Sequence, residues 1–256
     1  MPLRIRYFDE REACVHKIRF LSVSFLSLWF MCLNAVAGIS LDSTRIIFSS
    51  ADMANGQSIG VSSSATSSTP YLVKAQVLRD VKGERMETLF SVTPSLFRLE
   101  PGMTNQLRIL KTDNQVLPSD KESLFFLRVM ALPSGKGHEL DSNAELGGAI
   151  TVSTGSIIKL FYRPVGLSIT HQEAMARLQF SHQDNALHVT NSSPYYVTLT
   201  SLSVGNKPVA VSARRQNTMI APFSQMTYLN SNVVGNVTWQ AINDFGGIEK
   251  FNGTIQ

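Results

Sequence analysis

The pattern of apolar and polar residues at positions 147–164 predicts a β-strand about which the rest of the chain is organised. Ile150 and Val152 alternate with hydroxyl-bearing residues, which is the period of a strand buried on one face. From position 157 to 162 the residues are apolar except for Lys159, so this part predicts a strand within a sandwich that carries one cation. Pro164 cannot donate to a β-ladder and ends the strand. We expect the last strand of a first domain here, followed by the connection to a second.

Short apolar and β-branched runs recur on both sides of this stretch at the spacing of an all-β sandwich, and no helical period is sustained. Turn-forming residues such as Asn55-Gly56 separate them. Before the central strand the predicted strands cover residues 39–48, 58–61, 71–78, 89–92, 96–99, 104–110 and 123–132. After it they cover residues 166–170, 177–182, 186–190, 195–204, 207–211, 225–229, 233–242 and 249–255. The fold class predicted is all-β, with two β-sandwich domains at residues 38–164 and 165–256.

Residues 1–37 have the pattern of a signal peptide. Lys17 and Arg19 precede an apolar run at positions 20–33, and the small-x-small motif at residues 35–37 predicts cleavage after Ala37. The alternative is a membrane anchor, but the run is shorter than the roughly 20 residues that span a bilayer and three serines interrupt it. Export is the prediction, with no stable membrane insertion after cleavage.

Composition narrows the classes of protein and site. Both cysteines, Cys14 and Cys32, lie in the leader, so no disulfide stabilises the mature chain and cysteine-based metal sites are excluded. The leader holds five of the 23 basic and three of the 19 acidic residues, which leaves a net charge of +2. Such a balance gives no indication of nucleic-acid binding. The mature chain is long enough for two domains of about 100 residues each.

No pattern of catalytic residues is present. The histidines lack metal-ligand spacing, and no serine occupies a Gly-x-Ser-x-Gly turn. Asp141 and Glu145 fall in a predicted loop, where solvated charges are the favoured interpretation. We expect a protein that is not an enzyme and needs no cofactor or metal.

Two cations on apolar strands have alternative interpretations. Arg45 heads the first mature strand and Lys159 belongs to the last strand of the same domain. Each alone is typical of a surface cation whose alkyl stem covers apolar surface. Together they could hold a carboxylate through charge-assisted hydrogen bonds, and composition leaves the choice open.

The sequence resembles the periplasmic pilus chaperones, the immunoglobulin-like proteins of the chaperone–usher pathway. The resemblance is strongest at the run Ile-Lys-Leu-Phe-Tyr-Arg-Pro, residues 158–164, and extends over the whole mature chain. Further matching stretches, in the family's order, are residues 44–45, 70–73, 97–102, 117–125, 193–198 and 242–247.

This resemblance implies two immunoglobulin-like domains in a boomerang arrangement and a chaperone that delivers pilus subunits to an outer-membrane usher. Arg45 and Lys159 would anchor the C-terminal carboxylate of the subunit. The strand before Lys159 would pair with the subunit edge, with Ile150, Val152 and the weaker Thr154 filling its open groove. Covering that groove and edge would prevent aggregation.

The resemblance also implies an inter-domain ionic cluster of Glu122, Arg163 and Asp244, the alternative being three unrelated surface charges. Two departures from the family pattern stand out. The segment at residues 133–148 is long but lacks the cysteine pair of many long-loop members, so the subgroup stays open. Small residues, among them Thr154, replace bulkier ones in the donor strand, which predicts a weaker grip.

Two other classes of protein fit the sequence less well. A surface- or carbohydrate-binding sandwich would need an aromatic platform, which Trp29 in the leader and Trp239 in a strand do not provide. A pilin or adhesin would begin with a donor extension, whereas this chain enters the strand of Arg45 directly. The sequence leaves open which subunits are bound and whether the free chaperone self-associates.

Overall fold

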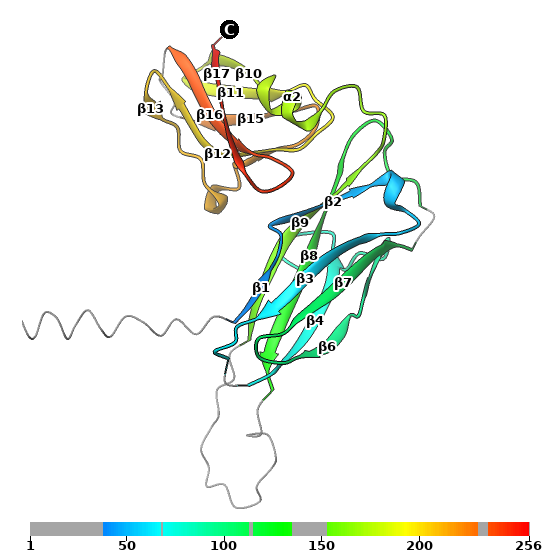
Figure 1. Ribbon diagram of the computed structural model, residues 1–256. Coiled ribbons are helices and arrows are strands. Elements are labelled where there is room, and N and C mark those ends of the chain that lie inside the picture. Colours follow the sequence, from blue (N-terminus) through cyan, green and yellow to red (C-terminus); the bar gives the residue numbers. More distant parts are fainter. Residues whose placement is uncertain (1–37, 68, 113–114, 135–152, 230–234, 256) are drawn as a thin grey trace, which may run out of the picture. The chain divides into compact units, whose positions relative to one another are not determined.

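The computed structural model describes residues 38–67, 69–112, 115–134, 153–229 and 235–255, and its regular structure is almost entirely β (Figure 1). Strands β1 to β9 form one pair of sheets and strands β10 to β17 form a second pair. Each pair encloses its own cluster of buried apolar side chains. The described chain therefore contains two β-sandwiches, in agreement with the predicted fold class.

The first sandwich has a four-stranded and a five-stranded sheet. The first contains, in order, β1 (Ile39–Leu41), β3 (Gln57–Ser63), β7 (Thr104–Lys111) and β5 (Phe90–Thr93). The second contains β2 (Arg45–Ser49), β9 (Thr154–Arg163), β8 (Ser123–Pro133), β4 (Tyr71–Leu78) and β6 (Leu96–Leu99). All neighbours are antiparallel except β2 and β9, which are parallel. Alternating residues of β4, such as Val73, Ala75 and Val77, point into the core, as the period of two requires.

The second sandwich packs around Trp239, which is 1% exposed and donates its indole N–H to the backbone oxygen of Met175 at 2.9 Å. One sheet contains β10 (Gln179–Gln183), β11 (Ala186–Asn191) and β15 (Ser224–Leu229). The other contains β13 (Lys207–Pro208), β12 (Val197–Val204), β16 (Asn236–Ile242) and β17 (Ile248–Thr254), and β14 (Met219–Ile220) pairs with β12. Short 3₁₀ turns lie at η2 (Ser50–Asp52) and η4 (Ala213–Arg215).

The predicted strand at residues 39–48 is two strands in different sheets. β1 pairs with β3, and β2 pairs with β9 on the other side of the core. Asp42 marks the break: its backbone N–H donates to Gly60 O at 3.2 Å, and its carboxylate accepts from the Gly60 N–H at 2.8 Å. Because these bonds keep the chain in register with β3 up to Asp42, the chain changes sheets between Asp42 and Arg45.

The predicted strand at residues 166–170 is wrong. These residues form turns that lead into a six-residue helix, α2 (His171–Ala176). Thr170 caps this helix, since its hydroxyl accepts from the Glu173 N–H while the Glu173 carboxylate accepts from the Thr170 N–H. This reciprocal capping box is a sequence signal for a helix start. The helix is too short to produce the repeated apolar period on which the sequence prediction relied.

Candidate functional site: a cation pair beside an open strand edge

Arg45 and Lys159 are direct neighbours in the structure. They are register partners in the parallel pair β2–β9. Arg45 is 8% exposed, donates through Nη1 to the backbone oxygen of Ile242 at 3.1 Å, and lies 5.9 Å from the centre of the Phe161 ring. Its Nε is buried and has no acceptor in the described part of the chain. A buried N–H without an acceptor is costly, and an added oxygen ligand would relieve that cost.

Lys159 is half-buried, and its ammonium donates to the Thr198 hydroxyl at 3.2 Å. Burial, with a further contribution from the charge of Arg45, lowers the pKa of Lys159 to about 8. Burial also lowers the pKa of Arg45, although Asp244 and Glu122 oppose the shift, and Arg45 keeps its charge at any physiological pH. The site thus presents two adjacent cations with spare donor capacity, which is the chemistry that binds a carboxylate.

A pocket of about 600 Å³ adjoins Lys159. Phe126 and Met219 contribute apolar wall, and the loop at residues 80–85 and the turn at residues 213–216 contribute polar wall. Asp80 shapes the loop by accepting from the backbone N–H groups of Gly83, Glu84 and Arg85. Lys159 is therefore one of the residues that line an open pocket.

The edge of β9 is open immediately before Lys159. β2 pairs with β9 only from Lys159 to Arg163, whereas β8 pairs with β9 from Thr154 to Tyr162. Residues 154–158 therefore have a ladder partner on one side only in the described part of the chain. Unpaired backbone groups at a strand edge are a template for pairing with another polypeptide.

Side-chain parity divides β9 into two faces. Ile158, Leu160 and Tyr162 pack against the core of the first sandwich, while Lys159 points the other way. Thr154 shares the core-facing parity, and Gly38 approaches its side chain so closely that a methyl group added at Gly38 would come 2.6 Å from Thr154 Cγ2. A strand added along this edge would therefore lie beside β9 residues whose side chains point to the core on one face, and would end next to the cation pair on the other.

The predicted donor residues Ile150 and Val152 lie outside the described residues. Thr154, the third predicted position, is the first residue of β9. The predicted cations and Thr154 are thus brought onto one strand pair, with the cation pair and Thr154 on opposite faces.

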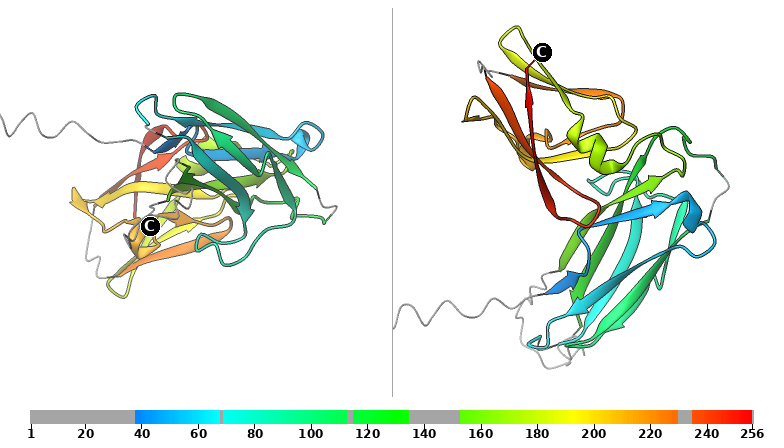
Figure 2. Two further views of the ribbon diagram at one scale, coloured as in Figure 1. Left: turned by 90° about the horizontal axis from the view of Figure 1, so that it is seen from below. Right: turned by 45° about the horizontal axis from the view of Figure 1, so that its top comes forward.

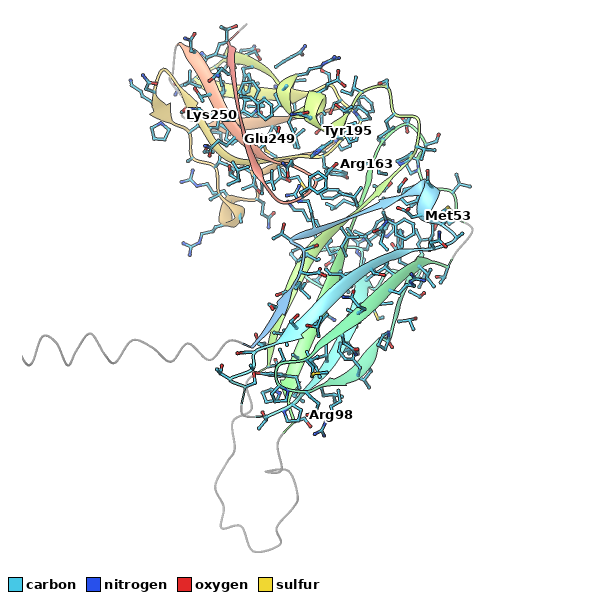
Figure 3. The ribbon with its side chains drawn as sticks, viewed as in Figure 1. Met53, Arg98, Arg163, Tyr195, Glu249 and Lys250 are labelled. Atoms are coloured by element: carbon cyan, nitrogen blue, oxygen red, sulfur yellow. The ribbon has the colours of Figure 1, made fainter. Side chains whose placement is uncertain are left out.

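Glu122, Arg163 and Asp244 form one contiguous ionic cluster. Arg163 Nε donates to Glu122 Oε1 at 2.7 Å, and its two terminal nitrogens donate to the Asp244 carboxylate at 2.6 and 2.7 Å. The guanidinium carbon also lies 4.9 Å from the centre of the Tyr195 ring, and Figure 3 shows these two side chains next to each other. Bidentate geometry and partial burial make this a strong arrangement rather than a set of solvated charges.

Burial and pairing shift the acids of this cluster in opposite directions. Burial raises the pKa of Glu122, only partly offset by Arg163 and by the Tyr196 N–H, which donates to Glu122 Oε2 at 2.8 Å. Burial opposes ionisation of Asp244 too, but its bonds to Arg163 and His171 outweigh it and hold the pKa of Asp244 well below its usual range.

Two members of the site were missed by sequence reasoning. His171 places Nδ1 3.0 Å from Asp244 Oδ1 and its other ring nitrogen 3.3 Å from the Tyr196 oxygen. Thr198 supports Lys159. The capping box at Thr170 could have located the helix that carries His171, but no local pattern marks a tertiary partner such as Thr198.

The described residues contain no group of three or more His, Cys, Asp or Glu side chains suited to holding a metal ion. Among the same residues, no helix is both long and apolar enough to cross a membrane.

Comparisons with known proteins match both sandwiches. Residues 38–168 match the family described as pili and flagellar-assembly chaperone, PapD N-terminal domain, and residues 173–252 match the pili assembly chaperone PapD, C-terminal domain. The chain is 32% identical over 225 residues to the chaperone protein FimC of Escherichia coli K12, covering 87% of each chain.

Solved structures give the same result. The E. coli chaperone DraB superposes with a TM-score of 0.70 at 29% identity, covering 86% of this chain and 97% of that one. The structure of the Salmonella enterica SafA pilin in complex with the SafB chaperone matches with a TM-score of 0.71 at 27% identity. The match covers 87% of this chain and 98% of that one. These matches extend over both sandwiches.

Proposed function

Because this chain belongs to the family of pilus-assembly chaperones, we propose that it binds pilus subunits in the periplasm, keeps them competent for assembly, and delivers them to an outer-membrane usher. In this proposal residues 1–37 are removed on export, and the domains at residues 38–164 and 165–256 act together. The protein works by binding alone, without catalysis or a cofactor.

The observation that carries the proposal is the pairing of Arg45 with Lys159 at the end of an open strand edge. A C-terminal carboxylate placed between them would give the buried Nε of Arg45 an acceptor and would offset the repulsion between the two cations. Charge-assisted hydrogen bonds of this kind are worth about twice a neutral one. The carboxylate would be bound without any requirement on the subunit's side chains.

The open edge supplies the second part of the interaction. A strand of the subunit would pair with residues 154–158 of β9 through main-chain hydrogen bonds, a mode of recognition for which chaperone–pilin complexes are a standard example. Ile150, Val152 and Thr154 would enter the subunit's groove on the face opposite to Lys159. The anchored carboxylate would fix the register, because a slip of one residue would turn those side chains away from the groove.

The cluster of Glu122, Arg163 and Asp244 has a supporting role in this proposal. Arg163 is the last residue of β9, Glu122 precedes β8, and Asp244 follows β16 in the second sandwich. By joining these elements through one guanidinium, the cluster would hold the second sandwich in a fixed relation to the anchor.

Co-purification from the periplasm with the pilus subunit encoded beside this gene tests the proposal. Wild-type protein is expected to capture the subunit, and Lys159→Ala and Arg45→Ala to lose it. Lys207→Ala, which removes an exposed cation on β13, is the matched control and should retain capture. Capture that survives both anchor substitutions would refute the carboxylate anchor.

A further inference from the structure

The tip of the hairpin β16–β17 presents an aromatic side chain to solvent beside the cation pair. Phe245 is 98% exposed and Ile248, three residues on, is 61% exposed. Figures 1 and 2 show this tip next to the start of β2 from different sides. Single exposed apolar residues are ordinary, so exposure alone does not indicate a role for Phe245. The indication comes from the contacts of the backbone on either side of Phe245.

The turn that carries Phe245 is held in one conformation by its own hydrogen bonds. Asn243 accepts through its side-chain oxygen from the N–H groups of Phe245 and Gly247, at 3.1 and 2.8 Å. The Asn243 amide nitrogen in turn donates to Glu249 Oε1 at 2.9 Å. The backbone presenting the ring is therefore already ordered, and a partner that packs on it would not bear that entropic cost.

Three contacts also tie this turn to the elements of the anchor. Ile242 accepts from Arg45, Asp244 forms the double hydrogen bond with Arg163, and Gly246 lies against Thr44. A methyl group added at Gly246 would come 2.7 Å from Thr44 Oγ1. Phe245 therefore lies between two residues that are each fixed beside the anchor strands, yet its own ring contacts almost nothing.

We infer that Phe245, together with Ile248, is an additional binding residue for the pilus subunit. Its ring would pack against an apolar side chain among the last few residues before the subunit's C-terminal carboxylate. The inference rests on the proposed carboxylate anchor and adds a side-chain preference to it. Continuity argues for this occupant: a chain whose carboxylate lies between Arg45 and Lys159 would end beside this turn, because residues of the turn contact Thr44 and Arg45. Aromatic side chains that become buried at an interface contribute more to binding than most other interface residues.

The experiment compares Phe245→Ala with Leu229→Ala, which truncates another exposed apolar side chain, 77% exposed, at the end of β15. Affinity of each purified protein for the subunit encoded beside this gene is measured by competition against the tagged wild-type chaperone. Phe245→Ala is expected to bind about tenfold more weakly, a difference of about 1.4 kcal/mol, and Leu229→Ala to bind like wild type. Both variants should keep the wild-type unfolding temperature.

A second variation locates the contact on the subunit. Replacing the apolar residues among the subunit's last three by serine should weaken binding to wild type but add little in the Phe245→Ala background, because the two changes remove the same contact. Additive losses, or equal affinities of Phe245→Ala and Leu229→Ala, would overturn the inference. Lys159→Ala separates the two hypotheses. If Lys159→Ala loses binding and Phe245→Ala does not, only the aromatic contact is refuted. If Lys159→Ala binds like wild type, the carboxylate anchor on which the aromatic contact rests is refuted.

Discussion

Lys159 lies opposite Arg45 in the parallel pair β2–β9, so the lysine is held in a half-buried position next to a permanent cation. Its pKa of about 8 is the result. The free protein thus keeps at its proposed binding site a charge that is easily lost, and the following two predictions depend on it.

Binding of the subunit should weaken as the pH rises above about 8. Lys159 is charged below its pKa and neutral above it, so the attraction for a carboxylate is complete near neutral pH and declines with deprotonation. The bound carboxylate itself favours the charged lysine, so Lys159 loses its proton at higher pH in the complex than in the free protein. Affinity measured by calorimetry between pH 7 and 10 gives the profile. Lys159→Arg, which stays charged, should lack it, and identical profiles would contradict the prediction.

Lys159→Met should stabilise the free chaperone while abolishing subunit capture. The lowered pKa means that the unfolded chain, with an ordinary pKa of 10.5, binds the proton more strongly between pH 8 and 10.5. Stability of the wild type therefore rises with pH through this window. The methionine variant has no such dependence and should unfold at higher temperature at pH 7, with a gain of about 1–2 kcal/mol. A variant that is less stable than wild type at pH 7 would contradict the assignment.

Arg163→Gln should destabilise the protein by about 3 kcal/mol, because it leaves Glu122, whose side chain is 1% exposed, and Asp244 without their shared cation. Arg177→Gln is the control, since it breaks an exposed pair with Glu173 and should cost less than about 1 kcal/mol. Urea denaturation at pH 7 measures both. Equal losses would mean that the cluster is no stronger than a surface ion pair.

The same cluster predicts a dependence on acid. The depressed pKa of Asp244 contributes stability above the carboxyl's ordinary pKa of 3.8, and this contribution is lost as the pH falls below that value. Burial raises the pKa of Glu122, so the contribution of Glu122 to stability increases as the pH falls and partly offsets the loss from Asp244. Asp244→Asn should therefore show a smaller loss of stability than wild type between pH 5 and 3. An unchanged acid profile would assign the loss to other groups.

Asn191→Ala should destabilise the second sandwich by about 2–4 kcal/mol. Asn191 is 1% exposed, donates to the backbone oxygens of Tyr195 and Ala221 at 2.7 and 2.9 Å, and accepts from Ser193. Removing it leaves buried carbonyl oxygens without donors. Asn252→Ala on the exposed side of β17 is the control and should change the unfolding temperature little. Thermal unfolding followed by near-UV circular dichroism of Trp239 reports on this sandwich.

The sequence was informative where short apolar and β-branched runs are separated by turn residues. Such runs form β4 and the second part of β9 in the structure, and their spacing was enough to predict the all-β class. It failed where a polar residue redirects the backbone. Asp42 divides an apparently continuous strand by bonding to Gly60, which is 18 residues away, and no local pattern contains that contact.

The site shows the same division. Family resemblance identified Arg45 and Lys159 as a pair, whereas local chemistry alone left open whether they bind a carboxylate together or are two separate surface cations. Their partners, Thr198 and the Ile242 backbone, come from strands far along the chain. The fold brings these groups together, so a sequence without its tertiary contacts cannot supply them. His171 is intermediate, since the capping box that orients its helix is local and could have been recognised.

The change of sheets between Asp42 and Arg45 sets a length as well as a direction. β2 begins at Arg45 and from there covers β9, so the starting point of β2 determines how many residues of β9 stay uncovered. Moving that starting point two residues toward the N-terminus would cover two more residues of the edge and leave a shorter one. The length of edge that the proposed function leaves free for a subunit is therefore set by β2. If that proposal holds, substitutions around Asp42 would lengthen or shorten the paired segment without altering β9 itself.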